Sequence, residues 1–229
     1  MGGLIAASAA LVILAPAVIH SVDGHQNARS EWANPLPATD GEQRDILKAL
    51  LKESPYLEST SPPPSGVERA DSFRQRVILL DTSAAFCESE FEESAFGATR
   101  DCTLSLPNHI ASSDFSGEIP KDLLENLILS NLEYKSLPTV AWPDVTISPR
   151  GVIDRIFDGG GWWNDFYKEF PDASGFLEVS RAVLTADGNH AVIYAGYHCG
   201  GLCGIGTIHL MTRKDDVWQI SESVDIWVS

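Results

Sequence analysis

The residues best suited to chemistry lie close together in one short stretch, HCGGLCG, at positions 198–204. This stretch contains two of the four cysteines of the chain, Cys199 and Cys203, and His198 directly precedes the first of them. Such a composition is typical of a redox dithiol, of part of a metal site, or of a turn closed by a disulfide. The spacing and the flanking residues favour the third interpretation.

Redox chemistry and metal binding both require a geometry that this stretch does not predict. Dithiol oxidoreductases usually place Cys-x-x-Cys at the N-terminus of a helix, whose dipole lowers the pKa of the first thiol. Here three residues separate Cys199 from Cys203, and a strand-like segment follows them. His198 and His209 would complete a set of zinc-ligand types, but adjacent strand residues such as His198 and Cys199 point to opposite faces. We therefore expect no redox site, no metal and no cofactor.

Five residues are candidates for facing a ligand. They are His198, His190, Tyr194, Trp162 and Trp163. The two histidines share one face of a predicted strand and flank the tyrosine, although an ordinary polar sheet face has the same pattern. The two tryptophans begin a predicted helix and, together with Tyr167, have the composition of a sugar-stacking platform. Aromatic residues at the start of a helix more often belong to a core.

The sequence contains no recognisable catalytic constellation. Asp165 and Glu169 lie one helical turn apart, as a glycosidase-like pair would, but a solvated acidic helix face has the same spacing. Neither Gly-x-Ser-x-Gly nor His-Glu-x-x-His occurs in the chain. We therefore assign no catalytic residue.

Negative charge restricts the classes of partner. The chain has 229 residues, of which 32 are acidic and 16 are basic, so its net charge is −16. Nucleic-acid binding depends on Lys and Arg contacts to phosphates, and anionic lipid surfaces attract the same basic residues. We expect no nucleic-acid partner and no anionic membrane surface, apart from an N-terminal anchor. An unidentified protein or small molecule remains as the ligand.

An apolar N-terminal segment predicts export. Residues 4–19 are apolar apart from Ser8, and the uninterrupted run before Pro16 is shorter than the roughly 20 residues that span a bilayer. This pattern is typical of a signal peptide, although no Lys or Arg precedes the run. An uncleaved anchor and a buried helix are the alternatives. We expect a periplasmic, extracellular or envelope-anchored protein.

Export permits disulfides between the four cysteines. Three pairings are arithmetically open, and we favour the local one, which joins Cys87 to Cys102 and Cys199 to Cys203. Loop-closure entropy predicts that the two bonds stabilise the fold by about 3 and about 2 kcal/mol respectively.

Three parts follow one another along the chain: the N-terminal segment 1–24, a region 25–66, and a single domain over 67–229. Region 25–66 combines a tether, a helix and a proline-rich linker. Thr39 and Glu42 have the spacing of a capping box, and helical periodicity after them predicts a helix over 40–53. The linker SPPPSG cannot continue a helix because proline lacks an N–H donor.

The last third of the chain has the clearest pattern. Its predicted strands cover residues 175–184, 190–199, 206–213 and 217–228. Turn-forming residues separate them, which favours a four-stranded antiparallel meander. Apolar residues alternate along the last strand, apart from Glu222, so they are expected on one face. The fold class is therefore α+β, with two or three helices packed on the meander, among them helices at about 119–133 and 161–170.

The segment 162–229 resembles the C-terminal part of an uncharacterised family of exported bacterial proteins. The family pattern is WWxDFY, then CGxLCG, then an ending of the type WxI…WIS; this chain has WWNDFY, CGGLCG and WQI…WVS. RVILLDTS and IPKDLLENLILSN resemble the N-terminal half of the family. The family has no established activity, so the resemblance implies export and assigns no catalytic residue.

The absence of a catalytic constellation favours a non-catalytic binding or interaction module. A hydrolase-type enzyme that uses carboxylates or histidines in a cleft is the second hypothesis, and a structural envelope protein is the third. Histidines and acids that converge on one site would favour the enzyme.

Overall fold

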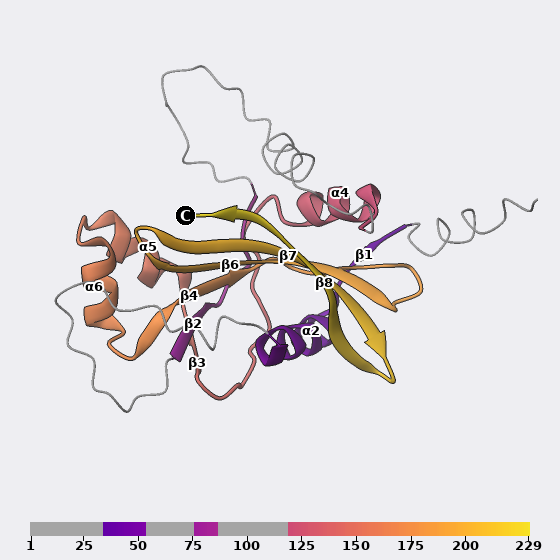
Figure 1. Cartoon of the computed structure of the whole chain (residues 1–229), viewed down its shortest axis with the longest axis horizontal. Helices are drawn as coiled ribbons and strands as arrows, with labels where there is room; N and C mark the ends of the chain where they lie inside the picture. Colours follow the sequence, from indigo (N-terminus) through magenta and orange to yellow (C-terminus); the bar gives the residue numbers. More distant parts are fainter. Residues whose placement is uncertain (1–33, 54–75, 87–118) are drawn as a thin grey trace, which may run out of the picture.

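A computed structural model of the chain describes residues 34–53, 76–86 and 119–229. It shows a long, twisted sheet with helices on both faces (Figure 1). The N-terminal segment 1–24, the SPPPSG linker and the predicted Cys87–Cys102 pair lie outside the described residues. No helix in the described part is long and apolar enough to cross a membrane.

The described ranges contain helices and strands in nearly the order that the sequence predicts. The elements are β1 (Leu36–Pro37), α2 (Asp40–Glu53), β2 (Arg76–Leu80), α4 (Lys121–Ser130), β3 (Val145–Ser148), α5 (Arg150–Asp158), α6 (Trp162–Glu169), β4 (Ala173–Val179), β5 (Val183–Leu184), β6 (His190–Gly200), β7 (Cys203–Lys214) and β8 (Val217–Val228). The expected helices at 40–53, 119–133 and 161–170 are present as α2, α4 and α6. Helix α5 was not predicted.

The α+β class is confirmed, but the sheet is larger than the predicted meander. Within the described ranges it has eight strands and is mixed. Strands β6, β7 and β8 form consecutive antiparallel pairs, as expected. On the other side of β6, the sheet continues through β4 to β2, and β2 pairs in parallel with both β3 and β4. Parallel strands need crossover connections, and α4, α5 and α6 lie in these connections.

The expected strand 175–184 is interrupted, because two buried side chains take over its hydrogen bonds. Strands β4 and β5 both pair with β6, on either side of a break at residues 180–182. Gln43 of α2 donates to the Ser180 carbonyl at 3.2 Å and accepts from the Ala182 N–H at 2.7 Å. Asn131, at the end of α4, accepts from the Arg181 N–H at 2.7 Å and donates to its carbonyl at 2.9 Å.

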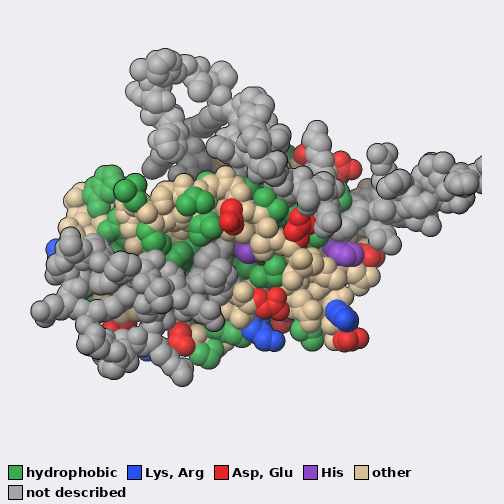
Figure 2. Space-filling model, in the orientation of Figure 1, with side chains coloured by type: hydrophobic (Ala, Val, Ile, Leu, Met, Phe, Trp, Pro, Cys, Tyr) green, Lys and Arg blue, Asp and Glu red, His purple; other side chains and the backbone are tan. Residues whose placement is uncertain are grey.

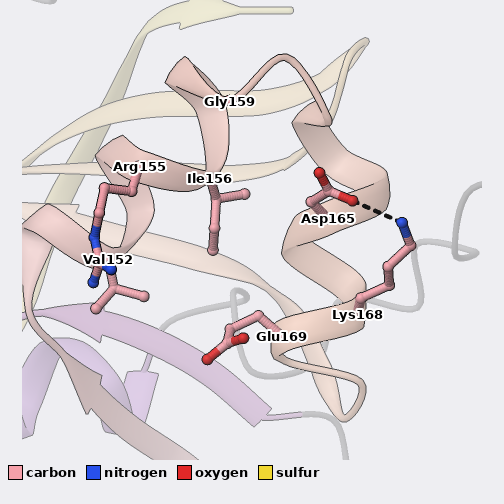
Figure 3. A pocket seen from close by; sticks show the side chains of 7 residues that line it. All are labelled: Val152, Arg155, Ile156, Gly159, Asp165, Lys168 and Glu169. Carbon is pink, nitrogen blue, oxygen red and sulfur yellow. Dashed lines mark hydrogen bonds and ion pairs between the residues drawn. The ribbon is translucent and has the colours of Figure 1, made fainter.

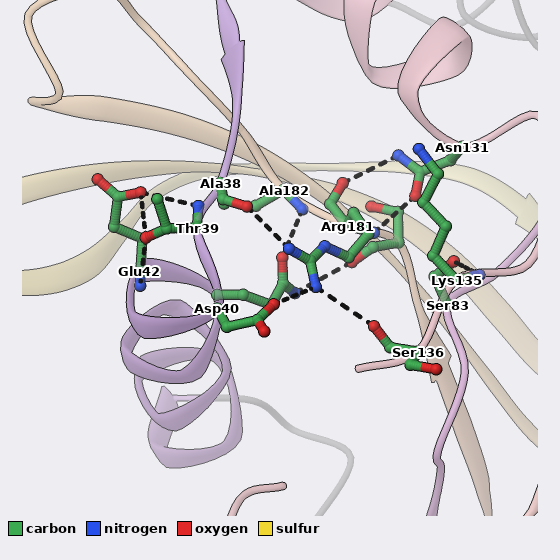
Figure 4. Close-up of polar contacts among 12 residues, drawn as sticks. Ala38, Thr39, Asp40, Glu42, Ser83, Asn131, Lys135, Ser136, Arg181 and Ala182 are labelled. Carbon is green, nitrogen blue, oxygen red and sulfur yellow. Dashed lines mark hydrogen bonds and ion pairs between the residues drawn. The ribbon is translucent and has the colours of Figure 1, made fainter. Parts of the chain in front are cut away.

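The side chain of Arg181 joins this break to the start of α2 (Figure 4). Its guanidinium donates to the Asp40 carboxylate at 2.7 Å and to the Ala38 carbonyl at 2.8 Å. A third bond, at 3.3 Å, reaches the Ser136 carbonyl. The break therefore fixes the position of α2 against the sheet.

Helices cover both faces of the sheet. Helix α2 packs on one face, in a core that includes Leu177, Met211 and Trp218, so the helix that the sequence placed before the main domain is buried in this core. Helix α4 packs on the opposite face, against Val192 and Ile208 among others. Helices α5 and α6 cover another part of that same face, over β2 and β4.

Two register shifts in the β7–β8 pair overturn the expected one-sided apolar pattern of the last strand. Ile220 lies opposite Met211 on the α2 face, whereas Val224 lies opposite Ile208 on the α4 face. A β-bulge adds one residue to a strand and so reverses the face on which later side chains lie. The second shift brings Trp227 opposite Gly206.

Candidate functional site

Polar residues gather on the α4 face of the sheet, near the carboxyl ends of its parallel strands. Asp81 and Thr82 follow β2, Arg150 follows β3, and Glu178 lies near the end of β4. The carboxyl ends of parallel strands meet at one edge of a sheet, and ligands commonly bind there. The arrangement therefore directs attention to the side chains around Glu178.

Glu178 connects a histidine and an arginine. One carboxylate oxygen lies 3.2 Å from Nε2 of His198, and the other accepts a hydrogen bond from Arg150 at 3.0 Å. Arg150 also donates to the Thr82 hydroxyl at 3.0 Å, and its guanidinium lies over the Tyr134 ring at 4.2 Å. The side chains of Arg150 and Glu178 are 12% and 19% exposed, and that of His198 is 30% exposed. His198 is therefore the member of the network most open to solvent.

The electrostatics of Glu178 fix the tautomer of His198. Burial would raise the pKa of Glu178, but hydrogen bonds and charge interactions with His198 and Arg150 outweigh it and lower the pKa below its ordinary value. The carboxylate is therefore ionised at neutral pH and can only accept hydrogen bonds. A neutral His198 must then carry its proton on Nε2, which leaves the lone pair on Nδ1 as an acceptor.

Aromatic rings hold the imidazole of His198 on both sides. Phe176 is stacked against it at 4.7 Å between ring centroids, and Trp227 lies against it at 5.3 Å. Trp163 continues the row by stacking on Phe176 at 5.7 Å. Within the part of the chain that the structure describes, Nδ1 of His198 has no hydrogen-bond partner. The ring is thus fixed in position, and its Nδ1 edge is the part left for a ligand.

Glycines in the neighbouring strand make this arrangement possible. Trp227 belongs to β8 but reaches across β7 toward β6, where its indole N–H donates to the Tyr194 hydroxyl at 3.1 Å. A Cβ on Gly206 would overlap the Trp227 indole, and one on Gly204 would lie 2.9 Å from it. The glycines that follow Cys203 in the sequence therefore serve the packing of Trp227.

The interpretation of HCGGLCG as a closed turn is confirmed. Cys199 and Cys203 lie at disulfide distance across the turn between β6 and β7, with their Cα atoms 5.1 Å apart. The Tyr167 hydroxyl of α6 donates to the Cys199 carbonyl at 2.8 Å, which anchors α6 to the hairpin. The disulfide therefore stabilises the strand end that carries His198.

The other predicted ligand-facing residues are dispersed. His190 shares the face of His198, but the two lie eight positions apart along β6, a span of about 26 Å at strand geometry. Trp163 belongs to the aromatic row, and Tyr167 is buried. Trp162 is 63% exposed and stands apart from the platform that the sequence suggested.

The candidate zinc ligands lie on different faces of the sheet. His198 is on the α4 face, whereas Cys199 belongs to the core on the α2 face. His209 lies beside Ile193 on that α2 face and its Nδ1 is 2.8 Å from the Ser223 hydroxyl. Burial lowers the pKa of His209 to about 4, although the nearby Asp225 acts in the opposite direction.

Asp165 and Glu169 line an open groove of about 490 Å³ between α5 and α6 (Figure 3), which we call the α5–α6 groove. Its other lining residues are Val152, Arg155, Ile156, Gly159 and Lys168. Asp165 is paired with Lys168 at 2.7 Å.

Four members of the site were not predicted from the sequence: Arg150, Phe176, Glu178 and Trp227. Arg150 and Glu178 are single charged residues in otherwise ordinary segments, and only the parallel pairing of β2 with both β3 and β4 brings them together. The alternating glycines 204 and 206 were a usable signal, because they leave space on one face of β7.

Acidic side chains are spread over the face of the molecule shown in Figure 2, as the composition predicts. Comparison of the chain with protein-family models, with curated proteins and with solved structures finds no match. The resemblance to an exported bacterial family therefore remains an expectation from the sequence.

Proposed function

We propose that this chain is an exported binding module whose ligand site is formed by Arg150, Glu178, His198, Phe176 and Trp227, here called the His198 site. The observation that carries the proposal is the fixed orientation of His198. Glu178 holds Nε2 at 3.2 Å, while Phe176 is stacked on the imidazole and Trp227 packs against it. A side chain held in this way on rigid strands presents one acceptor, Nδ1, in a defined direction.

The cost of the ion network supports a functional reading. Removing Arg150 and Glu178 from water is unfavourable, and apolar residues of similar size often stabilise a protein as well or better. The network is nevertheless built from residues of three different segments, which meet behind His198. The network orients the imidazole of His198. A binding site needs such an orientation, whereas a hydrophobic core does not.

The chemistry of the site indicates the class of ligand. Nδ1 accepts a hydrogen bond, so the ligand must offer an O–H or N–H donor. The edges of Phe176 and Trp227 beside it favour an adjoining apolar part. The net charge of −16 disfavours anions. A neutral small molecule with hydroxyl or amide groups fits these conditions.

A defined panel of uncharged alcohols, sugars and amides tests the proposal by ligand-observed NMR. We expect a subset to bind the wild-type protein and to lose binding to the His198→Phe variant, which keeps an aromatic ring but removes the acceptor. His190→Phe is the matched control and should retain binding. Equal binding to wild type and to His198→Phe would contradict the proposed site.

A hydrolase-type enzyme is the second candidate, and the Glu178–His198 hydrogen bond is the observation that favours it. A carboxylate that orients a histidine is the arrangement of a general base, with Nδ1 of His198 as the proton acceptor. Among the described residues, however, no serine, threonine or cysteine contacts Nδ1. Turnover of p-nitrophenyl acetate that is lost in both His198→Phe and Glu178→Gln would favour the enzyme over the binding module.

A further inference from the structure

The α5–α6 groove is separate from the His198 site and has its own pattern of charge (Figure 3). Four charged side chains line it, and two of them neutralise each other, because Lys168 pairs with Asp165 at 2.7 Å. Arg155 and Glu169 remain. The Arg155 guanidinium uses Nε to bond the Gly151 carbonyl at 3.0 Å, and no carboxylate of the described residues pairs with it. Glu169 has no partner in that part of the chain either.

The position of Glu169 is not explained by helix stability. It is the last residue of α6, where the helix dipole disfavours a negative charge. Figure 3 shows its carboxylate directed toward α5, on the side of Val152 and Arg155. A cationic group in the groove would be attracted by both the carboxylate and the C-terminal end of the helix.

The space between these charges is partly apolar. Val152 and Ile156, both half-buried, line the groove from α5. The groove volume of about 490 Å³ is within the range of roughly 300–1,000 Å³ that is typical of small-molecule sites. The groove thus offers a guanidinium, an apolar surface and a carboxylate.

We propose that the α5–α6 groove binds a short peptide with free termini, of two or three residues. The peptide ammonium would pair with Glu169, its terminal carboxylate would pair with Arg155, and an apolar side chain would pack on Val152 and Ile156. A free amino acid has the same two charges, but it fills less of the groove. Its ammonium and carboxylate also lie closer together than those of a dipeptide.

Isothermal titration calorimetry with L-alanyl-L-leucine tests this inference on the full chain. We expect saturable binding that weakens about fivefold when the peptide is N-acetylated and about fivefold when its carboxylate is amidated, as for solvent-exposed ion pairs. Glu169→Gln should bind the free and N-acetylated peptides equally, and Arg155→Gln should bind the free and amidated peptides equally. Glu125→Gln, which removes an exposed acid from α4, should bind as wild type.

Absence of saturable binding to the wild-type protein would overturn the proposal. So would a preference for the free over the capped peptides that is unchanged in both Glu169→Gln and Arg155→Gln. Binding of free L-leucine as tightly as the dipeptide would overturn the peptide class. His198→Phe should bind the dipeptide normally, so failure of the His198 site and failure of the groove are separate outcomes. Circular dichroism of each variant confirms that the fold is intact.

Discussion

Trp227 of β8 lies in the space that a side chain at Gly206 of β7 would occupy. This relationship links the glycine-rich strand after the disulfide to His198, because the indole crosses β7 and packs on the imidazole at 5.3 Å. The packing around His198 therefore depends on Gly206 through Trp227.

Gly206→Ala tests this dependence. The added methyl group would displace Trp227 and break its hydrogen bond to Tyr194. We expect a loss of about 2 kcal/mol in the free energy of unfolding, as for other overpacked sites, and a shift of the His198 ring resonances. Gly201→Ala is the matched control, since a Cβ there meets no atom within 4 Å. Equal stability of the two variants would show that Trp227 does not need the glycine.

Asn131→Ala tests the clamp at the strand break. The substitution removes both side-chain bonds to Arg181 and leaves its backbone N–H and carbonyl without these partners. We expect destabilisation of about 3 kcal/mol in denaturant unfolding, because unsatisfied buried backbone groups are costly. Asn126→Ala removes a comparable but exposed bond to the Asp122 carbonyl and should change stability by less than about 0.5 kcal/mol. A similarly small effect at Asn131 would contradict the clamp.

His209 predicts a pH dependence of stability. Its pKa is lowered from 6.5 to about 4 by burial, so the unfolded chain binds a proton in this interval before the folded protein does. Stability should therefore fall as the pH decreases from 6.5 to 4, by about 3 kcal/mol in all. Urea unfolding across this range measures the slope. His209→Asn should remove the contribution of His209 to this slope. Above pH 7 the stability of the variant and of the wild-type protein should change in parallel. An unchanged slope between pH 6.5 and 4 would contradict the assignment.

The disulfide predictions can be checked together by non-reducing peptide mapping of protein made in an oxidising compartment. We expect a Cys199–Cys203 link, and reduction of this short loop should cost about 2 kcal/mol of stability. The Cys87–Cys102 link is a prediction from the sequence, and the same map tests it. Free thiols at 199 and 203 would contradict the closed turn.

Local patterns predicted the elements well. The capping box at Thr39 and Glu42 forms as expected, with the Thr39 N–H bonded to the Glu42 carboxylate at 2.9 Å, and α2 begins directly after it. The turn at HCGGLCG was also predictable, because its glycines and cysteines act within a few residues.

Long-range pairing was not predictable in the same way. Residue alternation assigns the apolar positions of β8 to one face, but the two register shifts depend on β7 and move Trp227 onto the face of His198. Similarly, Gln43 and Asn131 are unremarkable in sequence, although together they bond the backbone at the break between β4 and β5. Arg150 and Glu178 were not predicted as site members for the same reason, since they meet only through the pairing of parallel strands.

The most direct test of the account is the protonation of His198, measured by long-range ¹H–¹⁵N correlation NMR near neutral pH. For the neutral imidazole, we predict a proton on Nε2 and a bare Nδ1 in the free protein. We further predict that the tightest-binding compound of the panel shifts Nδ1 more than Nε2, and that Glu178→Gln reduces the preference for this tautomer. A neutral tautomer with its proton on Nδ1, or a compound that binds without moving the His198 resonances, would contradict the proposal that His198 presents the acceptor of a ligand site.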